Sequence, residues 1–202
     1  QINQNISPIV DDDYTLELFD KTQLYATTNS EEMKLADIII ICVPTPIDEK
    51  YHPNLYPLKS AVSSVSKNLQ KGQLIIIEST IYPGTTEEVI VPLLEESGME
   101  AGQDFGVAYC PERIDPGNQK WVLGNIPRVV GGLTPENLAQ AKSFYQQFIK
   151  AEIKTLDCIK SAEAVKILEN TFRDVNIAFI NEMARSFDSL GINLHEVIQG
   201  AS

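Results

Sequence analysis

The sequence predicts an α/β protein, in which a doubly wound sheet of parallel strands is followed by one long helix. Three observations predict it. Short runs of β-branched residues alternate with segments of helical periodicity over residues 1–156. Two of these runs are continuously apolar, which is typical of parallel strands that helices cover on both faces. From residue 161 to residue 190 the pattern is helical throughout.

The predicted strands combine β-branched or apolar residues with turn signals at their ends. They are 24–28, 38–43, 73–78, 104–109, 128–130 and 153–156. Pro44-Thr45-Pro46 ends the second of them, and Gly131-Gly132 is predicted to form the turn that ends the fifth.

The predicted helices follow from apolar residues on one face and from capping residues at their first turns. They are a short helix that Asn29 and Ser30 can cap, 58–69, 85–96, 135–148 and 161–190. The segment 85–88 fits a capping box, and Thr134 is a cap with Pro135 in the first helical position. The last helix would be about 45 Å long.

Composition bounds the class of protein. The chain has 202 residues, of which 43% are hydrophobic and 22% charged, and its net charge is −12. These values exclude collagen-like and disordered chains, and the acidic balance argues against nucleic-acid or anionic-membrane partners. The longest apolar run, 38–43, is too short to span a membrane. Three widely spaced cysteines without a CxxC motif indicate reduced thiols, so we expect a cytoplasmic protein.

Candidate ligand-binding residues follow three predicted strands. The segments are 43–46, 78–80 and 110–113. Because ligands of doubly wound sheets lie outside the carboxyl ends of the strands, three such turns favour a binding site. The alternative is that each is an ordinary polar, proline-rich turn.

The long helix carries a polar stripe, with Lys166, Asn170 and Arg173 on one face. Its other faces are so apolar that we expect the helix to be mostly buried. A confined lysine beside an amide can stabilise an oxyanion or hold a hydroxyl group. The alternative is a solvated helix face.

Several motifs are missing. The sequence contains no GxG, GxxxxGK[ST] or GxSxG. His52 and His195 have no Cys or His partner at metal-ligand spacing, so no metal site is predicted.

Four stretches together resemble the UDP-glucose/GDP-mannose dehydrogenase family of nucleotide-sugar dehydrogenases. They are 36–46, 78–86, 109–114 and 161–182, and they occur in the family's order. The Pro-Glu-Arg sequence at 111–113 is most similar to the branch that acts on UDP-N-acetyl-D-mannosamine or UDP-N-acetyl-D-glucosamine.

The resemblance implies a Rossmann-type NAD-binding domain at 1–156 and the start of an all-α central domain at 157–202. It implies a homodimer that pairs through 161–190. The implied activity is the oxidation of the C6 alcohol of a UDP-sugar to a carboxylate, with NAD used twice, for surface polysaccharide synthesis.

Site residues are implied in the same way. Thr80 matches a threonine that positions the catalytic water, and Glu112 matches a glutamate with an acid/base role. Lys166 and Asn170 match the pair near the reacting oxygen. The residues implied to hold NAD are Val43, Pro44, Thr45, Ser79 and Thr80. Those implied to bind the UDP-sugar are Glu112, Arg113, Lys166, Asn170 and Arg173.

The sequence also departs from the family pattern. The family's first strand and glycine-rich phosphate turn precede a stretch that resembles 6–9, and its nucleophilic cysteine lies in a carboxyl-terminal domain. The chain starts at Gln1, so we expect an internal fragment that binds NAD weakly and is inactive by itself. We expect Cys42 in a buried strand, Cys110 at a strand end and Cys158 in a linker, and none of them replaces the nucleophile.

Two other interpretations remain open. The chain could be a truncated, non-catalytic module that dimerises through its long helix. It could instead be a dehydrogenase of the β-hydroxyacid type, which also joins a Rossmann domain to a long helix and uses a Lys–Asn pair. The turns at 44–46 and 111–113 argue against the second of these.

Overall fold

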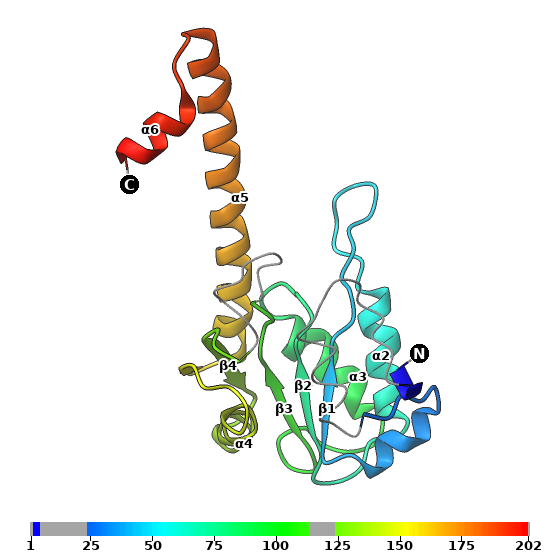
Figure 1. Ribbon diagram of the computed structural model, residues 1–202. Coiled ribbons are helices and arrows are strands. Elements are labelled where there is room, and N and C mark those ends of the chain that lie inside the picture. Colours follow the sequence, from blue (N-terminus) through cyan, green and yellow to red (C-terminus); the bar gives the residue numbers. More distant parts are fainter. Residues whose placement is uncertain (1, 5–23, 114–123, 202) are drawn as a thin grey trace.

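The computed structural model describes residues 2–4, 24–113 and 124–201 and contains one five-stranded sheet. Its strands are β1 Ile38–Ile41, β2 Leu74–Ile77, β3 Gly106–Tyr109, β4 Arg128–Gly132 and β5 Ile153–Leu156. They pair in chain order (Figure 1). All neighbours are parallel except β3 and β4, which are antiparallel, so the predicted all-parallel sheet is wrong at this one pair.

The helical elements alternate with the strands as the sequence predicts. They are η1 Ile2–Gln4, η2 Ser30–Leu35, α2 Tyr56–Ser66, η3 Thr86–Ile90, α3 Val91–Glu95, α4 Pro135–Gln146, α5 Ile159–Ser189 and α6 Leu194–Ala201. Asn29 caps η2 and Thr134 caps α4 through their side-chain oxygens, as predicted. Helix α6 is not among the elements predicted from the sequence.

Helices cover both faces of the sheet, as a doubly wound fold requires. Ile75 and Ile77 of β2 face the core formed with α2, α3 and the first turns of α5. Leu74 and Ile76 face the opposite core, formed with α4. The alternation follows from the two-residue period of a strand. All four side chains are buried, which confirms the prediction for this strand.

The strand predicted at 38–43 forms as β1, but the prediction that helices cover both of its faces is wrong. β1 ends at Ile41 and is an outer strand of the part of the sheet that the structure describes. Because α4 packs on β2 to β5, the side chain of Ile40 remains 39% exposed. Cys42, expected within a buried strand, is exposed just beyond β1.

Gly131 and Gly132 do not form the predicted turn, because they are the last residues of β4. A side chain at Gly131 would lie 2.9 Å from Cα of Ile159 in α5. A side chain at Gly132 would lie 2.3 Å from the backbone nitrogen of Leu138 in α4. The two glycines therefore allow a helix to approach each face of the strand.

The predicted strand at 24–28 is also wrong, since these residues have no regular structure. The Asn3 amide group makes the hydrogen bonds that a strand partner would make. Its nitrogen donates to Ala26 O at 2.8 Å, and its oxygen accepts from Ala26 N at 2.6 Å. The segment 6–9, which resembles a stretch that follows the family's phosphate turn, lies outside the described residues.

The predicted capping box at 85–88 does not form. The helix begins with a π-helical turn, and Thr85 already has helical angles and caps nothing. Its hydroxyl donates to Tyr82 O at 2.7 Å instead. The N–H groups of this helix start are bound by a carboxylate from α5.

Helix α5 extends away from the sheet, beyond the carboxyl ends of β1 to β3 (Figure 1). The expectation that it is mostly buried is wrong for this chain, because only residues of its first turns are buried. Phe172 and Phe179 of its apolar face are 70% and 59% exposed. Among the described residues no helix has the length and hydropathy to cross a membrane.

Candidate active site

The three turns singled out in the sequence lie at one edge of the sheet, where β1, β2 and β3 end and α5 begins to rise (Figure 1). This edge follows from the parallel pairing of the three strands. The structure thus brings together turns that lie between residues 43 and 113 of the chain.

Ser79 ties the turn after β1 to the turn after β2. Its hydroxyl oxygen accepts from Val43 N at 2.9 Å, and the hydroxyl lies 2.8 Å from Val43 O. Beside this contact, the Thr45 hydroxyl is buried and has no hydrogen-bond partner among the described residues. Pro44 and Thr80 are exposed on the two turns. The turns therefore hold a fixed relative position with polar groups left to bind a ligand.

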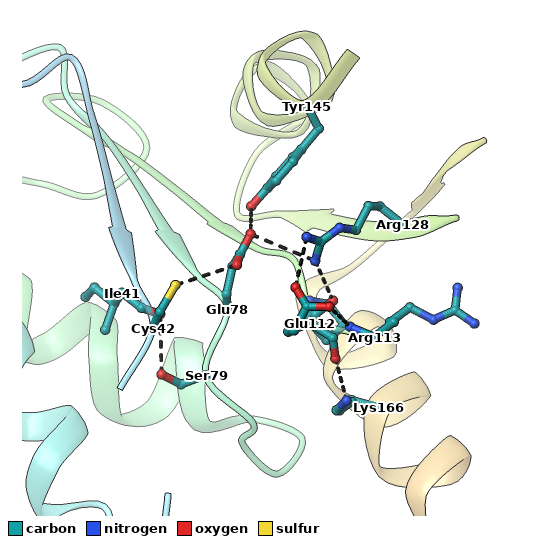
Figure 2. A network of polar contacts seen from close by, with 10 residues as sticks. Ile41, Cys42, Glu78, Ser79, Glu112, Arg113, Arg128, Tyr145 and Lys166 are labelled. Atoms are coloured by element: carbon teal, nitrogen blue, oxygen red, sulfur yellow. Dashed lines mark hydrogen bonds and ion pairs between the residues drawn. The ribbon is translucent and has the colours of Figure 1, made fainter. Parts of the chain in front are cut away.

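A buried polar network links the ends of β2 and β3 (Figure 2). Glu78, which follows β2, accepts a hydrogen bond from the Tyr145 hydroxyl at 2.5 Å, and one of its oxygens lies 4.0 Å from Arg128. Arg128 also pairs with the Glu112 carboxylate at 2.9 Å and donates to Pro111 O at 3.3 Å. Arg128 itself is only 2% exposed. Its guanidinium thus fixes the segment that follows β3.

Two cysteines border this network, and their surroundings disfavour the thiolate. Cys42 is exposed only in part, and the partial burial of its sulfur, with a smaller contribution from Glu78, raises the pKa of this thiol to about 11. Burial likewise raises the pKa of Cys110 to about 12. A thiol with so high a pKa is a poor nucleophile at neutral pH, which agrees with the interpretation that neither replaces the family's cysteine. Cys158 is exposed at the start of α5, with its sulfur 3.1 Å from the Ser161 hydroxyl oxygen.

Lys166 of α5 contacts the segment after β3. Its ammonium group donates to the backbone carbonyl of Glu112, while the Glu112 carboxylate accepts from Arg113 N at 2.5 Å. Burial lowers the pKa of Lys166 below its usual value. Asn170 is half-buried one helical turn further along the same face. Glu112, Lys166 and Asn170 therefore lie together, and Thr80 occupies the adjacent turn.

Arg113 does not present a free guanidinium. It forms an ion pair with Glu169, in which Nε lies 3.2 Å from Oε2, and it donates to Pro127 O at 2.9 Å. With Arg173, it lines an open groove of about 830 Å³ along α5. The groove has apolar walls, which include Phe172. In this arrangement Arg173 is the more accessible of the two predicted substrate-binding arginines.

Sequence reasoning missed Arg128 and Tyr145. The only local signal was an arginine at the start of an apolar strand, where a charged side chain needs a buried partner. Within the described part of the chain there is no group of three or more His, Cys, Asp or Glu side chains that could hold a metal ion.

The comparison with known families decides the relationship. Residues 1–149 match the UDP-glucose/GDP-mannose dehydrogenase family, NAD binding domain, and residues 160–202 match the central domain of the same family. The chain belongs to this family. Its Rossmann-type sheet and long helix are the expected ones, except for the corrections given above.

Comparison with individual proteins is consistent with this family. The chain is 42% identical over 202 residues to UDP-N-acetyl-D-glucosamine 6-dehydrogenase of Pseudomonas aeruginosa, covering 100% of this chain and 48% of the relative. It is 45% identical to Protein CapL of Staphylococcus aureus, over 89% of this chain and 43% of that protein. The chain thus spans about half the length of the curated relatives it matches.

A solved structure shows the same arrangement. The UDP-D-ManNAc dehydrogenase from Pyrococcus horikoshii superposes with a TM-score of 0.89 at 38% sequence identity. The match covers 98% of this chain and 48% of that one. The placement of α5 against the sheet is therefore shared with this member of the family.

Proposed function

We propose that this chain is the NAD-binding domain and the beginning of the central domain of an NAD-dependent nucleotide-sugar 6-dehydrogenase. The enzyme oxidises the C6 alcohol of a UDP-N-acetyl-hexosamine to a carboxylate, for surface polysaccharide synthesis. The names of the P. aeruginosa and P. horikoshii relatives support this substrate class. The domain division that we propose is 1–156 and 157–202. The observation that carries the proposal is the contact between Lys166 and the Glu112 segment at the carboxyl edge of the sheet.

NAD fits the turns after β1 and β2. Val43 and Ser79 hold the two turns together, and the buried Thr45 hydroxyl lacks a partner among the described residues. In a doubly wound sheet a nucleotide binds at this edge, so Val43, Pro44, Thr45, Ser79 and Thr80 would hold it. When bound, NAD supplies the hydride acceptor for both oxidation steps.

Residues of this chain stabilise charge at the reacting oxygen and accept a proton. The Lys166 ammonium and the Asn170 amide stabilise negative charge that develops on the sugar C6 oxygen. The Glu112 carboxylate accepts a proton, and Arg128 fixes its orientation. The Thr80 hydroxyl positions the water that supplies the second oxygen of the carboxylate. Arg173 and Arg113 line the groove that receives the anionic nucleotide sugar.

We also propose that the enzyme is a cytoplasmic homodimer that pairs through α5. The apolar residues of this helix that lie beyond the sheet are largely exposed in the single chain, including Leu168, Val175 and Phe179. A contiguous apolar face of this kind marks an interface, and a second copy of the helix presents a matching surface.

The test uses the product of the complete reading frame that encodes this chain. NADH formation is followed with UDP-N-acetylmannosamine, UDP-N-acetylglucosamine and UDP-glucose, and two NADH are expected per sugar oxidised. Lys166→Met should lower kcat by at least about 100-fold. The matched control is Lys154→Met, which changes an exposed lysine of β5 and should leave kcat unchanged. No turnover with any nucleotide sugar would refute the proposal.

A further inference from the structure

A buried carboxylate joins α5 to the turn that follows β2. Glu163 is 0% exposed. Its two oxygens accept three hydrogen bonds, from Gly84 N at 2.5 Å, Thr86 N at 2.8 Å and the Thr86 hydroxyl at 2.6 Å. These donors lie at the start of η3, 77 to 79 residues earlier in the chain. Glu163 therefore caps the start of η3, a role that the sequence predicts for the capping box at 85–88.

The pairing is specific for a carboxylate. The first N–H groups of a helix have no partners within the helix, and the helix start favours negative charge. A buried carboxylate is costly unless several donors surround it, and here three donors do so. Each side of the contact thus requires the other, and the turn cannot move independently of α5 without leaving buried groups unpaired.

The contact lies between two parts of the proposed active site. Glu163 and Lys166 are three residues apart and are neighbours on one face of α5. The turn that Glu163 binds begins at Ser79 and contains Thr80. Gly131 of β4 packs closely against Ile159 and so fixes how near the start of α5 lies to the sheet. The position of Lys166 relative to Thr80 is therefore set through Glu163.

We propose that Glu163 is a positioning residue, which locks the turn 79–86 against α5 and so aligns Thr80 with Lys166. The role in catalysis rests on the proposed function; the lock itself does not. It also joins the segment matched to the family's NAD binding domain to the segment matched to its central domain. A salt bridge on the outer side of the same contact, between Lys160 and Glu88 at 3.0 Å, is exposed and serves as a comparison.

The experiment measures amide hydrogen exchange and steady-state kinetics on the product of the complete reading frame. Glu163→Gln keeps the shape but turns an amide N–H₂ toward at least one N–H donor. We expect exchange at Gly84 and Thr86 to accelerate about tenfold or more. We expect kcat to fall about 10- to 100-fold, with a much smaller change in KM for the nucleotide sugar. Glu88→Gln, which removes only the exposed pair, should change neither.

Thr86→Val serves as a second variant, in case Glu163→Gln does not fold. It removes one of the three donors, so it should shift exchange and kcat in the same direction by less. Unchanged exchange in both variants would overturn the proposal, and so would faster exchange with an unchanged kcat. If the wild-type enzyme forms no NADH, the proposed function fails, whereas the exchange measurement still decides whether Glu163 locks the turn.

Discussion

Replacing Arg128 by methionine tests whether the buried network holds the segment after β3. The guanidinium is 2% exposed, lies 2.9 Å from the Glu112 carboxylate and 4.0 Å from that of Glu78. Removing one partner of a buried ion pair typically costs about 3–5 kcal/mol, because the remaining charge stays buried without compensation. The Glu112 side chain is 37% exposed, so water compensates part of this loss. We therefore expect Arg128→Met to lower the free energy of unfolding by an amount near the lower end of this range, about 3 kcal/mol.

The assay is chemical denaturation of the chain followed by circular dichroism, with a double-mutant cycle that adds Glu112→Gln. Because the two side chains are in contact, the cycle should give a coupling energy of about 1 kcal/mol. The matched control is Arg185→Met, whose partner Glu182 lies 3.5 Å away and whose pair is exposed on both sides. This control should lose no more than about 0.5 kcal/mol. If Arg128→Met lowers the free energy of unfolding no more than Arg185→Met does, the network does not hold the segment after β3.

Three further predictions concern the strand glycines, the thiols and α5. Gly132→Ala places a side chain 2.3 Å from the Leu138 backbone nitrogen and should cost at least about 3 kcal/mol in denaturant unfolding, whereas Gly124→Ala, with open space around it, should be neutral. Cys42 is exposed, yet with a pKa of about 11 only about one thiol in a thousand is ionised at pH 8. Its alkylation, followed by peptide mass spectrometry, should therefore accelerate with pH up to about 11, and a rate independent of pH would contradict the raised pKa. Phe179→Glu, at an exposed position of α5 outside the groove, should convert a dimer of the complete protein to a monomer in light scattering, while Glu182→Gln should not, and a wild-type monomer would exclude pairing through α5.

Local patterns predicted most of the fold. The apolar run at 73–78 located β2, β5 has the predicted bounds, the helical periodicity located α5 to within two residues, and Thr134 caps α4 as expected. These features depend on residues close together in the sequence, so local chemistry determines them. The same holds for the proposal that ligands bind where β1, β2 and β3 end, because strand ends can be located from the sequence.

The remaining features depend on contacts between distant residues. Gly131 and Gly132 have the composition of a turn, but two helices that pack on opposite faces make them strand residues. The segment 85–88 has the composition of a capping box, yet Glu163 provides a stronger acceptor from 77 residues away. Arg128 likewise gains its partners only when β2, β3 and β4 meet. Periodicity also showed that α5 has apolar faces, without showing what would cover them.

The buried polar contacts at the carboxyl edge form a closed circuit. Arg128 joins the end of β2 to the segment after β3, and Ser79 attaches the turn after β1 to the circuit from outside. Lys166 then joins that segment to α5, and Glu163 joins α5 back to the turn after β2. In a closed circuit each contact limits the movement of the next, so a change at one member alters the geometry at the others, and substitutions within it should not be additive. The candidate catalytic residues come from separate elements, and this circuit is what gives them a fixed mutual geometry.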